Sequence, residues 1–467
     1  MTIINQNSIS KIACLLVVLM TLGSLKSCKN QEEIESPNID LPHNERNTYP
    51  TTKIEVYLDD TVRIHKEIYG INNYWTKITN EEFVAFTNKL DELGYTLLRF
   101  PGGWESEHYD WINNTTPGWK KEPEEPGATA SQIIEYTPSS SFVVRTVPYL
   151  NDPSEINMEL LLNEAKDLVS KYGNDVTIWE IGNEWFLVNK SKRSEYLNRY
   201  ASLAKELVLG MKSQNPAIQI FLGCDWLQPD DLATMKNIME EAWELVDGIN
   251  IHIYAGDVDP DHHIDSIQQR IELIKKIASK SKIYVSEWNA VKDYTDQKRN
   301  LRAASLQMQV LFRMMRSGTI AASIWPPNEG IEGLNLMDSN FDIVYPPGQA
   351  FNWMTESFFG NALKVKYSII PAIAAKTDQN KVIVFLFGMT ADTHEINIKL
   401  DNGIKSDLVT AEVMYSTNPD EKTPAILRNI NSSVKVEASG MSYRLVINPG
   451  GDQRGKEWEI IKLVLRL

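Results

Sequence analysis

Over much of the chain, short runs of β-branched and aromatic residues alternate with longer segments in which apolar residues recur at helical spacing. Six longer segments, the first at residues 81–93 and the last at 298–317, have the length of amphipathic helices. Strands that alternate with helices form parallel βα units, which predicts an α/β fold built as a (β/α)8 TIM barrel. The eight predicted strands are residues 67–72, 96–100, 142–148, 177–182, 218–223, 248–254, 282–287 and 319–325.

One segment of this region, residues 102–141, is rich in Pro, Gly, Ser and Glu and has no clear helix. Loops of this length are usually functional or mobile, so it is predicted to wall a pocket or to line a cleft. A doubly wound open sheet is the alternative fold. It lacks support because no glycine-rich phosphate loop follows an early strand.

After about residue 360 the pattern changes to short alternating strands separated by turn residues, with no long helix between them. This predicts a C-terminal antiparallel β-sandwich over residues 361–467. The barrel is assigned to residues 53–360, although the isolated strand at 53–58 is a candidate member of the sandwich. A total of 467 residues suits a barrel of roughly 250 or more residues with one accessory domain.

The first residues have the pattern of an export signal. Lys11 precedes an apolar run of about a dozen residues, which is too short to span a bilayer and is typical of a secretory signal peptide. Residues 24–28 resemble a bacterial lipobox, so residues 1–27 are predicted to be removed and Cys28 to carry lipid. Residues 28–52 then form a flexible tether like that of Bacteroidetes surface lipoproteins. We expect an outer-membrane lipoprotein exposed at the cell surface, with a periplasmic protein or a plain signal peptide as alternatives.

Composition and charge exclude several classes of protein. The chain has 62 Asp and Glu against 47 Lys and Arg, a net charge of −15 that disfavours a nucleic-acid partner. Three cysteines are too few for a disulfide scaffold, and Cys224 is expected to be a packed residue. Residues 257–265 hold several acids and two histidines, but they lack the spacing of a zinc or calcium site, so a solvated loop is expected there. No metal or cofactor is predicted.

Two glutamates mark the ends of predicted strands four and seven. Glu184 lies in the segment Glu180-Ile-Gly-Asn-Glu-Trp185, and Glu287 lies in Ser286-Glu-Trp-Asn289. Because the strand ends of a barrel converge, carboxylates from opposite walls can come close together. Such a pair can hydrolyse a glycosidic bond, one carboxyl protonating the leaving oxygen while the other attacks the sugar. The alternative is that each glutamate is a salt-bridge partner at the rim.

The motifs resemble those of clan A glycoside hydrolases, and in particular family 51 α-L-arabinofuranosidases and the related families 39 and 79. The resemblance spans residues 53 to 467 and rests on Tyr69-Gly-Ile-Asn72, Leu98-Arg-Phe-Pro-Gly-Gly103, Glu180-Ile-Gly-Asn-Glu184, Ile251-His-Ile-Tyr254 and Ser286-Glu-Trp-Asn289.

The resemblance implies a role for each matched residue. Glu184 would be the general acid/base and Glu287 the nucleophile. Asn183 would bind the sugar 2-hydroxyl, and Arg99 would hold Glu287 ionised. His252 and Tyr254 match the His-x-Tyr of the clan, with Tyr254 donating to Glu287. Glu180 is expected to pair with a basic neighbour, Arg99 or Arg145. Trp325 would stack on the sugar.

The chain departs from family 51 after the double glycine, where Trp104 opens the long loop, and after Glu184, where Trp185 and Phe186 follow. Six of the twelve tryptophans lie after predicted strand ends, which suggests a sugar-stacking surface. Two of the six, Trp75 and Trp226, are expected to pack instead. The other four are Trp104, Trp185, Trp288 and Trp325.

The sequence therefore predicts a retaining glycoside hydrolase that cleaves a plant or algal polysaccharide, with α-L-arabinofuranosidase as its specific expectation. An endo-β-glycanase of the same clan is one alternative. A glycan-binding surface lipoprotein without turnover is the other. The sugar, the linkage, exo or endo action and the oligomeric state stay open.

Overall fold

The computed structural model describes residues 50–115, 127–153, 157–256, 262–290, 301–328, 335–388, 394–401, 406–415, 424–431, 434–436, 442–447 and 459–467. The predicted signal peptide, residues 28–49 of the predicted tether and the lipidation of Cys28 lie outside these residues. Within the described ranges, no helix combines the length and the apolar character needed to cross a membrane.

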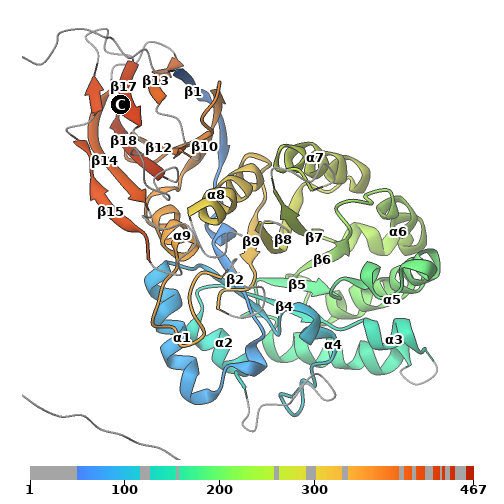
Figure 1. Ribbon diagram of the computed structural model, residues 1–467. Coiled ribbons are helices and arrows are strands. Elements are labelled where there is room, and N and C mark those ends of the chain that lie inside the picture. Colours follow the sequence, from blue (N-terminus) through green and yellow to red (C-terminus); the bar gives the residue numbers. More distant parts are fainter. Residues whose placement is uncertain are drawn as a thin grey trace, which may run out of the picture. The chain divides into compact units, whose positions relative to one another are not determined.

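Eight parallel strands close into a barrel in chain order, as the alternating pattern predicts (Figure 1). Each strand pairs with its sequence neighbours, and the last returns to the first through Gly70 and Ser323. The TIM-barrel prediction is confirmed. The strands are β2 (Gly70–Asn72), β3 (Leu97–Phe100), β4 (Ser140–Val144), β5 (Ile178–Ile181), β6 (Gln219–Cys224), β7 (Gly248–Ala255), β8 (Lys282–Ala290) and β9 (Ala321–Ile324).

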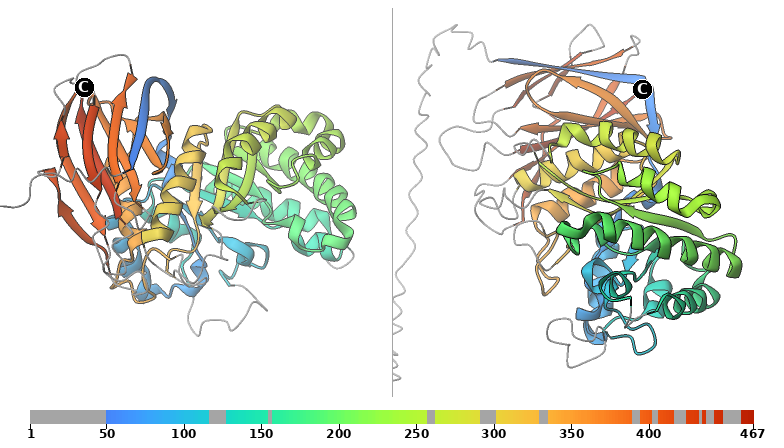
Figure 2. Two further views of the ribbon diagram at one scale, coloured as in Figure 1. Left: turned by 45° about the horizontal axis from the view of Figure 1, so that its top comes forward. Right: turned by 90° about the vertical axis from the view of Figure 1, so that its right-hand side faces the viewer.

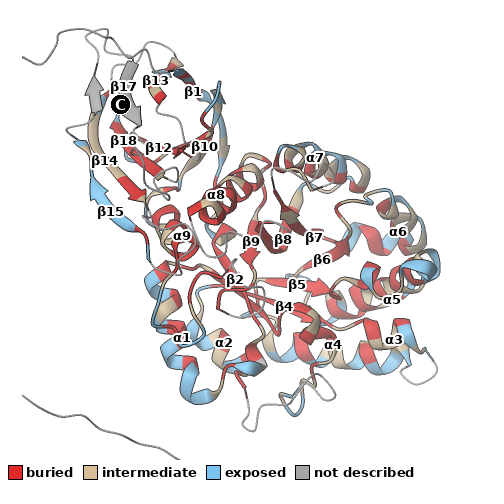
Figure 3. Cartoon of the chain, in the orientation of Figure 1, coloured by how far each residue is buried: buried red, intermediate tan, exposed pale blue. Residues whose placement is uncertain are grey.

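The covering helices follow the predicted segments, each packing an apolar face on the barrel (Figure 3). The first begins at the capping box of Thr79 and Glu82. It ends at Gly94, whose φ of 75° suits glycine. These helices are α1 (Asn80–Leu93), α4 (Met158–Tyr172), α5 (Arg193–Gln214), α6 (Asp231–Met239), α7 (Ile267–Ala278) and α8 (Leu301–Arg316).

The segment after β3 is more ordered than its composition predicts. A 3-10 helix, η3 (Gly103–Glu107), and helix α2 (Ala130–Tyr136) lie within it, and Thr129 and Gln132 form a capping box at the start of α2. The expectation of a segment without a helix is therefore wrong in part. Seven residues are too few to show helical periodicity, so only the cap signals α2 in the sequence. A second short helix, α3 (Val147–Asn151), follows β4.

The C-terminal domain is a ten-stranded sheet in which β1 (Thr51–Arg63) is a central strand, parallel to β13 and antiparallel to β10. Strands from both halves of the sheet share one apolar core, so the sheet folds over itself as a sandwich does (Figure 2). The other strands are β10 (Asn361–Tyr367), β11 (Ala372–Lys376), β12 (Lys381–Gly388), β13 (His394–Leu400), β14 (Asp407–Tyr415), β15 (Ile426–Asn429), β16 (Val434–Val436), β17 (Ser442–Ile447) and β18 (Glu459–Arg466).

The outer face of this sheet packs on the barrel through aromatic side chains. Phe385 of β12 lies 5.6 Å from Phe358 and 6.0 Å from Trp353, measured between ring centroids. Trp353 belongs to α9 (Pro346–Ser357), a helix that the sequence pattern does not predict, and Phe312 of α8 completes the contact with Phe358. Alternate residues of β12 thus face the domain's own core and the barrel helices, which explains its continuous apolar sequence.

Candidate active site

The barrel brings Glu184 and Glu287 together at the C-terminal ends of its strands. Glu184 follows β5, and Glu287 lies within β8. One oxygen of each carboxyl group and a ring nitrogen of His252 all lie within 4.8 Å of one another. Glu287 is buried, while the side chain of Glu184 is 21% exposed, so a ligand can reach Glu184 from the solvent side.

Glu287 is held by two donors that favour its ionised form. Arg99 Nη1 donates to Oε1 at 2.8 Å, and the Tyr254 hydroxyl donates to Oε2 at 3.0 Å. Burial, together with the charges of Glu287 and Glu184, raises the pKa of Tyr254 well above its ordinary value, so this hydroxyl keeps its proton. Both carboxyl oxygens of Glu287 thus accept from donors, an arrangement that suits a nucleophile.

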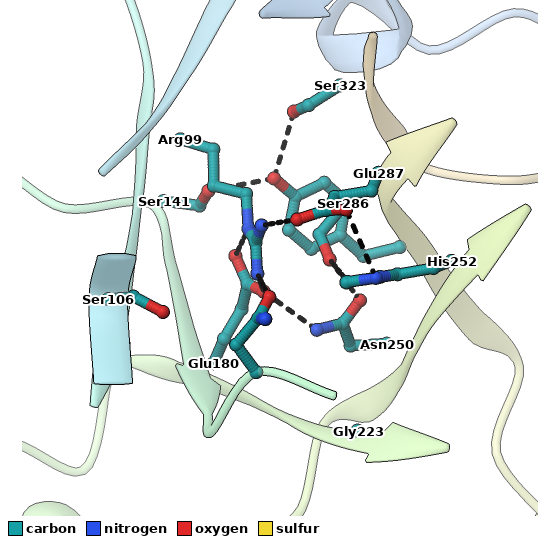
Figure 4. Close-up of polar contacts among 12 residues, drawn as sticks. Arg99, Ser106, Ser141, Glu180, Gly223, Asn250, His252, Ser286, Glu287 and Ser323 are labelled. Atoms are coloured by element: carbon teal, nitrogen blue, oxygen red, sulfur yellow. Dashed lines mark hydrogen bonds and ion pairs between the residues drawn. The ribbon is translucent and has the colours of Figure 1, made fainter. Parts of the chain in front are cut away.

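Arg99 is fully buried and connects three residues of the site (Figure 4). Its Nε and Nη2 donate to Glu180 at 2.9–3.1 Å, and Nη2 also donates to Asn183 Oδ1 at 2.8 Å. Of the two cations that the sequence offers as partners of Glu180, the structure selects Arg99, because Arg145 pairs with Glu164. The guanidinium thus links β3, β5 and β8 under the floor of the site.

Glu184 stands on an unusual stretch of backbone. Its φ of 45° and ψ of 38° are left-handed, and Gly182, two residues earlier, has a φ of 73°. A Cβ at Gly182 would lie 2.3 Å from Thr146 Oγ1, so only glycine fits. This sharp turn lifts the Glu184 side chain to the rim, where its Oε1 lies 2.9 Å from His252 Nδ1.

A buried carboxylate that the sequence analysis does not single out anchors this turn. Glu107, at the end of η3, accepts hydrogen bonds from the backbone N–H groups of Asn183, Thr146 and Val147 and from the Thr146 hydroxyl. Burial raises the pKa of Glu107, while these four donors oppose that rise. Nothing local in the sequence distinguishes Glu107 from Glu105, which is also buried.

His252 bridges the two glutamates from β7. Its Nδ1 lies 2.9 Å from Glu184 Oε1 and 3.4 Å from Glu287 Oε2, and its Nε2 lies 3.0 Å from the Ser286 hydroxyl. Burial lowers the pKa of His252, but the carboxylates of Glu287 and Glu184 outweigh burial and raise it. The geometry therefore brings together Arg99, Asn183, Glu184, His252, Tyr254 and Glu287.

The tryptophans divide into two groups. Trp185 is buried, stacks on Tyr200 at 5.0 Å and donates its Nε1–H to the Gly223 carbonyl, while Trp288 is buried against α8 and α9. Neither ring offers a face to a sugar, which corrects the sequence-based expectation for both, since packing behind the barrel satisfies their apolar surface. Trp104 and Trp325 are half-buried, and Trp325 contacts Tyr74 edge to face.

Glu184, His252 and Glu287 are also the one set of three possible metal ligands at suitable spacing among the described residues. Of the acidic loop 257–265, residues 257–261 lie outside the description, and His263 caps the short 3-10 helix Ile264–Ser266. Cys224 is a buried free thiol whose pKa burial raises, as expected of a packing residue.

No family model and no curated protein matches the chain. Solved structures do. An α-L-arabinofuranosidase from Thermotoga maritima, in complex with arabinose, is similar at 15% identity and a TM-score of 0.63, covering 89% of this chain and 100% of its own. A family 51 α-L-arabinofuranosidase from Bifidobacterium longum is 12% identical with a TM-score of 0.66, covering 88% of this chain and 99% of its own.

A Paenibacillus polymyxa xyloglucanase of glycoside hydrolase family 44 is 12% identical with a TM-score of 0.57, and the match covers 90% of this chain and 100% of that one. At these identities the likeness concerns the fold. The chain has the barrel-and-sheet fold that these glycoside hydrolases share, along nearly its whole described length.

Proposed function

We propose that this protein is a retaining glycoside hydrolase in which Glu184 is the general acid/base and Glu287 the nucleophile. The observation that carries the proposal is the approach of their oxygens to within 4.8 Å of each other at the C-terminal end of the barrel. Retaining enzymes keep their two carboxyl groups about 5–5.5 Å apart, whereas inverting enzymes leave about 6.5–9.5 Å for a water molecule.

The two environments fit the two steps of retention. Glu287, held by Arg99 and Tyr254, attacks the anomeric carbon while Glu184 gives its proton to the leaving oxygen. Glu184 then takes a proton from a water molecule, which attacks the anomeric carbon of the glycosyl-enzyme. This step frees Glu287 and releases the sugar with its original anomeric configuration. In this proposal Asn183, whose Oδ1 accepts from Arg99, binds the sugar hydroxyl beside the reacting carbon.

For the substrate we propose an α-L-arabinofuranoside of plant or algal polysaccharide. The support is the higher TM-scores to arabinofuranosidases, 0.63 and 0.66, than to the xyloglucanase, 0.57. That xyloglucanase keeps an endo-β-glycanase as the second candidate.

The lipobox-like residues before Cys28 support anchoring in the outer membrane. Radioactive palmitate should label the wild-type protein in cells and leave Cys28→Ser unlabelled.

A panel of aryl glycosides and plant and algal polysaccharides tests the activity. Wild type should hydrolyse at least one arabinofuranoside, and Glu287→Ala should lose at least about 10⁴-fold of that rate because its nucleophile is gone. Glu195→Ala, which removes an exposed carboxyl group that pairs with Arg199, is the control. Proton NMR of the first product should show the anomeric configuration of the substrate.

Full activity in Glu287→Ala would contradict the assignment of Glu287 as the nucleophile. A first product of inverted configuration would contradict a retaining mechanism. Hydrolysis of internal β-glycan bonds without arabinose release would favour the endo-β-glycanase. Saturable glycan binding without any released reducing end would favour a binding protein.

A further inference from the structure

A continuous chain of hydrogen bonds leads from Arg99 to Glu184, and Figure 4 shows its buried part from Arg99 to His252. After Arg99 and Glu180 come Asn250, whose Nδ2 lies 2.7 Å from Glu180 Oε2, and Ser286, whose hydroxyl lies 2.5 Å from Asn250 Oδ1. Ser286 Oγ is 3.0 Å from His252 Nε2, and His252 Nδ1 is 2.9 Å from Glu184 Oε1. Asn250 and Ser286 are both buried.

Each link of this chain has one possible direction. Glu180 receives three N–H contacts from buried Arg99 and so acts as an acceptor, which makes the Asn250 amide group the donor to it. The carbonyl oxygen of Asn250 then faces Ser286 and can only accept the hydroxyl proton. Because that single proton is used, Ser286 Oγ must accept from His252, and His252 Nε2 carries a hydrogen.

The other ring nitrogen, Nδ1, therefore holds a lone pair in the neutral imidazole, and it faces carboxyl groups. Glu184 reaches it from the turn after β5 and Glu287 from β8, while Tyr254 lies further along β7. Arg99, from β3, is the cation whose charge lowers the pKa of His252. A lone pair and a carboxylate cannot approach to 2.9 Å without a proton between them, so one proton lies on this contact.

We propose that Asn250 and Ser286 fix the His252 proton on Nε2, so that His252 Nδ1 and Glu184 Oε1 share one further proton, the one delivered to the leaving group. The inference rests on the proposed function and assigns Asn250 and Ser286 as positioning residues, since neither touches the reacting carboxyl groups directly. In the first step the shared proton passes from the pair to the leaving oxygen. In the second step a proton from water returns to the pair, so the pair holds the same number of protons at the start and at the end of each turnover.

Nitrogen NMR of histidine tests the proton placement without any substrate. The chain has seven histidines. Two-bond proton–nitrogen correlations distinguish the two neutral tautomers, and the signals absent from His252→Gln identify His252. At a pH where the ring is neutral, we expect wild type to carry its proton on Nε2. A neutral His252 protonated on Nδ1 in wild type overturns the proposal, whatever the activity of the protein.

Ser286→Ala removes the acceptor for Nε2–H, so the neutral ring should turn to the Nδ1–H tautomer, which can donate to the glutamates. Ser141→Ala is the matched control, because Ser141 is equally buried in the barrel but bonds to Tyr284. With Ser286→Ala, the basic limb of the kcat/KM profile should move to lower pH by about one unit, a tenfold change in proton occupancy. Ser141→Ala should leave tautomer and limb unchanged.

The leaving group separates this role from a merely structural one. In Ser286→Ala, kcat/KM for alkyl glycosides should fall about tenfold, while nitrophenyl glycosides, which need no protonation, should change less than about threefold. Equal losses on both substrates overturn the proposal. If no glycoside is cleaved, the proposed function fails and the NMR result alone decides the proton placement. If hydrolysis occurs but wild type shows Nδ1–H, the proposed function stands and the inference fails.

Discussion

The surroundings of Glu287 and Glu184 differ although oxygens of the two carboxyl groups lie within 4.8 Å of each other. Glu287 is buried within β8 and meets a guanidinium and a phenol, which donate to it and keep it an acceptor. Glu184 stands on a left-handed turn, is partly exposed, and meets an imidazole that can share a proton. Two carboxyl groups of the same kind thus have different partners from different strands, as the two roles proposed for them require.

The two sides also differ in what holds them in place. Arg99 fixes Glu287 through its side chain, whereas Glu107 fixes the region of Glu184 through the backbone N–H of Asn183. The hydrogen bond from Arg99 acts on the carboxyl group of Glu287 itself, whereas the hydrogen bond to Glu107 acts on the orientation of the turn that carries Glu184. Substitutions on each side separate these two effects.

Glu184→Ala should have the largest effect, because it removes the proposed proton donor and leaves the proposed nucleophile intact. We expect the rate on alkyl glycosides to fall about 10³–10⁴-fold, with a much smaller loss of the glycosylation rate on nitrophenyl glycosides. Azide should restore turnover by taking the place of water, and the product should be a glycosyl azide. Steady-state kinetics with and without azide measures this. No difference between leaving groups would contradict the role of Glu184.

Arg99→Met should destabilise the protein and inactivate it, since it leaves Glu180 and Glu287 as unpaired buried charges. The expected loss in the free energy of unfolding is about 3–5 kcal/mol. Lys89→Met, which breaks the exposed pair with Glu92, should cost at most about 1 kcal/mol. Urea unfolding of both variants at pH 7 makes the comparison. Equal losses would show that Arg99 does not balance the buried carboxylates.

Glu107→Gln should weaken the Glu184 side alone. The amide keeps one acceptor oxygen but turns an N–H₂ group toward backbone donors, so at least one N–H loses its partner, at a cost of about 1–3 kcal/mol. Activity on alkyl glycosides should fall, because the turn that carries Glu184 is no longer fixed. Glu82→Gln, at a helix cap on the surface, serves as control. Thermal unfolding and kcat/KM are measured for both variants. A loss of stability with unchanged kcat/KM would contradict the role of Glu107 in orienting the Glu184 turn.

Tyr254→Phe should have the smallest effect and should act on the Glu287 side alone. Losing one donor leaves Glu287 Oε2 less firmly held, so alkyl and nitrophenyl glycosides should lose rate to the same extent. The rate should fall about tenfold, or about 1.4 kcal/mol, near the lower end of what one hydrogen bond to a charged group contributes. Tyr196→Phe, whose hydroxyl bonds to Asn151, should leave both rates unchanged. A loss confined to alkyl glycosides would assign Tyr254 to the Glu184 side.

Much of the fold follows from local patterns. The eight barrel strands and most of the C-terminal strands appear where alternation predicts them, because burial on one or both faces leaves a periodic trace in the sequence. Helices α2 and α9 were missed because the first is short and the second begins with two prolines. Strands β10, β11 and β15 also escaped prediction.

The candidate site was predictable where a residue's place on a strand decides its neighbours. Glu184 and Glu287 meet because the ends of parallel strands converge, and Arg99, His252 and Tyr254 lie on such strands too. Trp185 and Trp288 were misjudged for a related reason, since a position near a strand end does not say whether a ring points into the cleft or behind the barrel.

By itself, the sequence determined the α/β class, the order of the elements and the two glutamates at the rim, since periodicity and strand position are local properties. Only the tertiary structure decided which partner each carboxyl group has: Glu107 under the Glu184 turn, and Asn250 and Ser286 behind His252. These contacts join residues 34 to 76 positions apart in the chain, and hydrogen bonds depend on distances of a few tenths of an ångström, which no sequence pattern records.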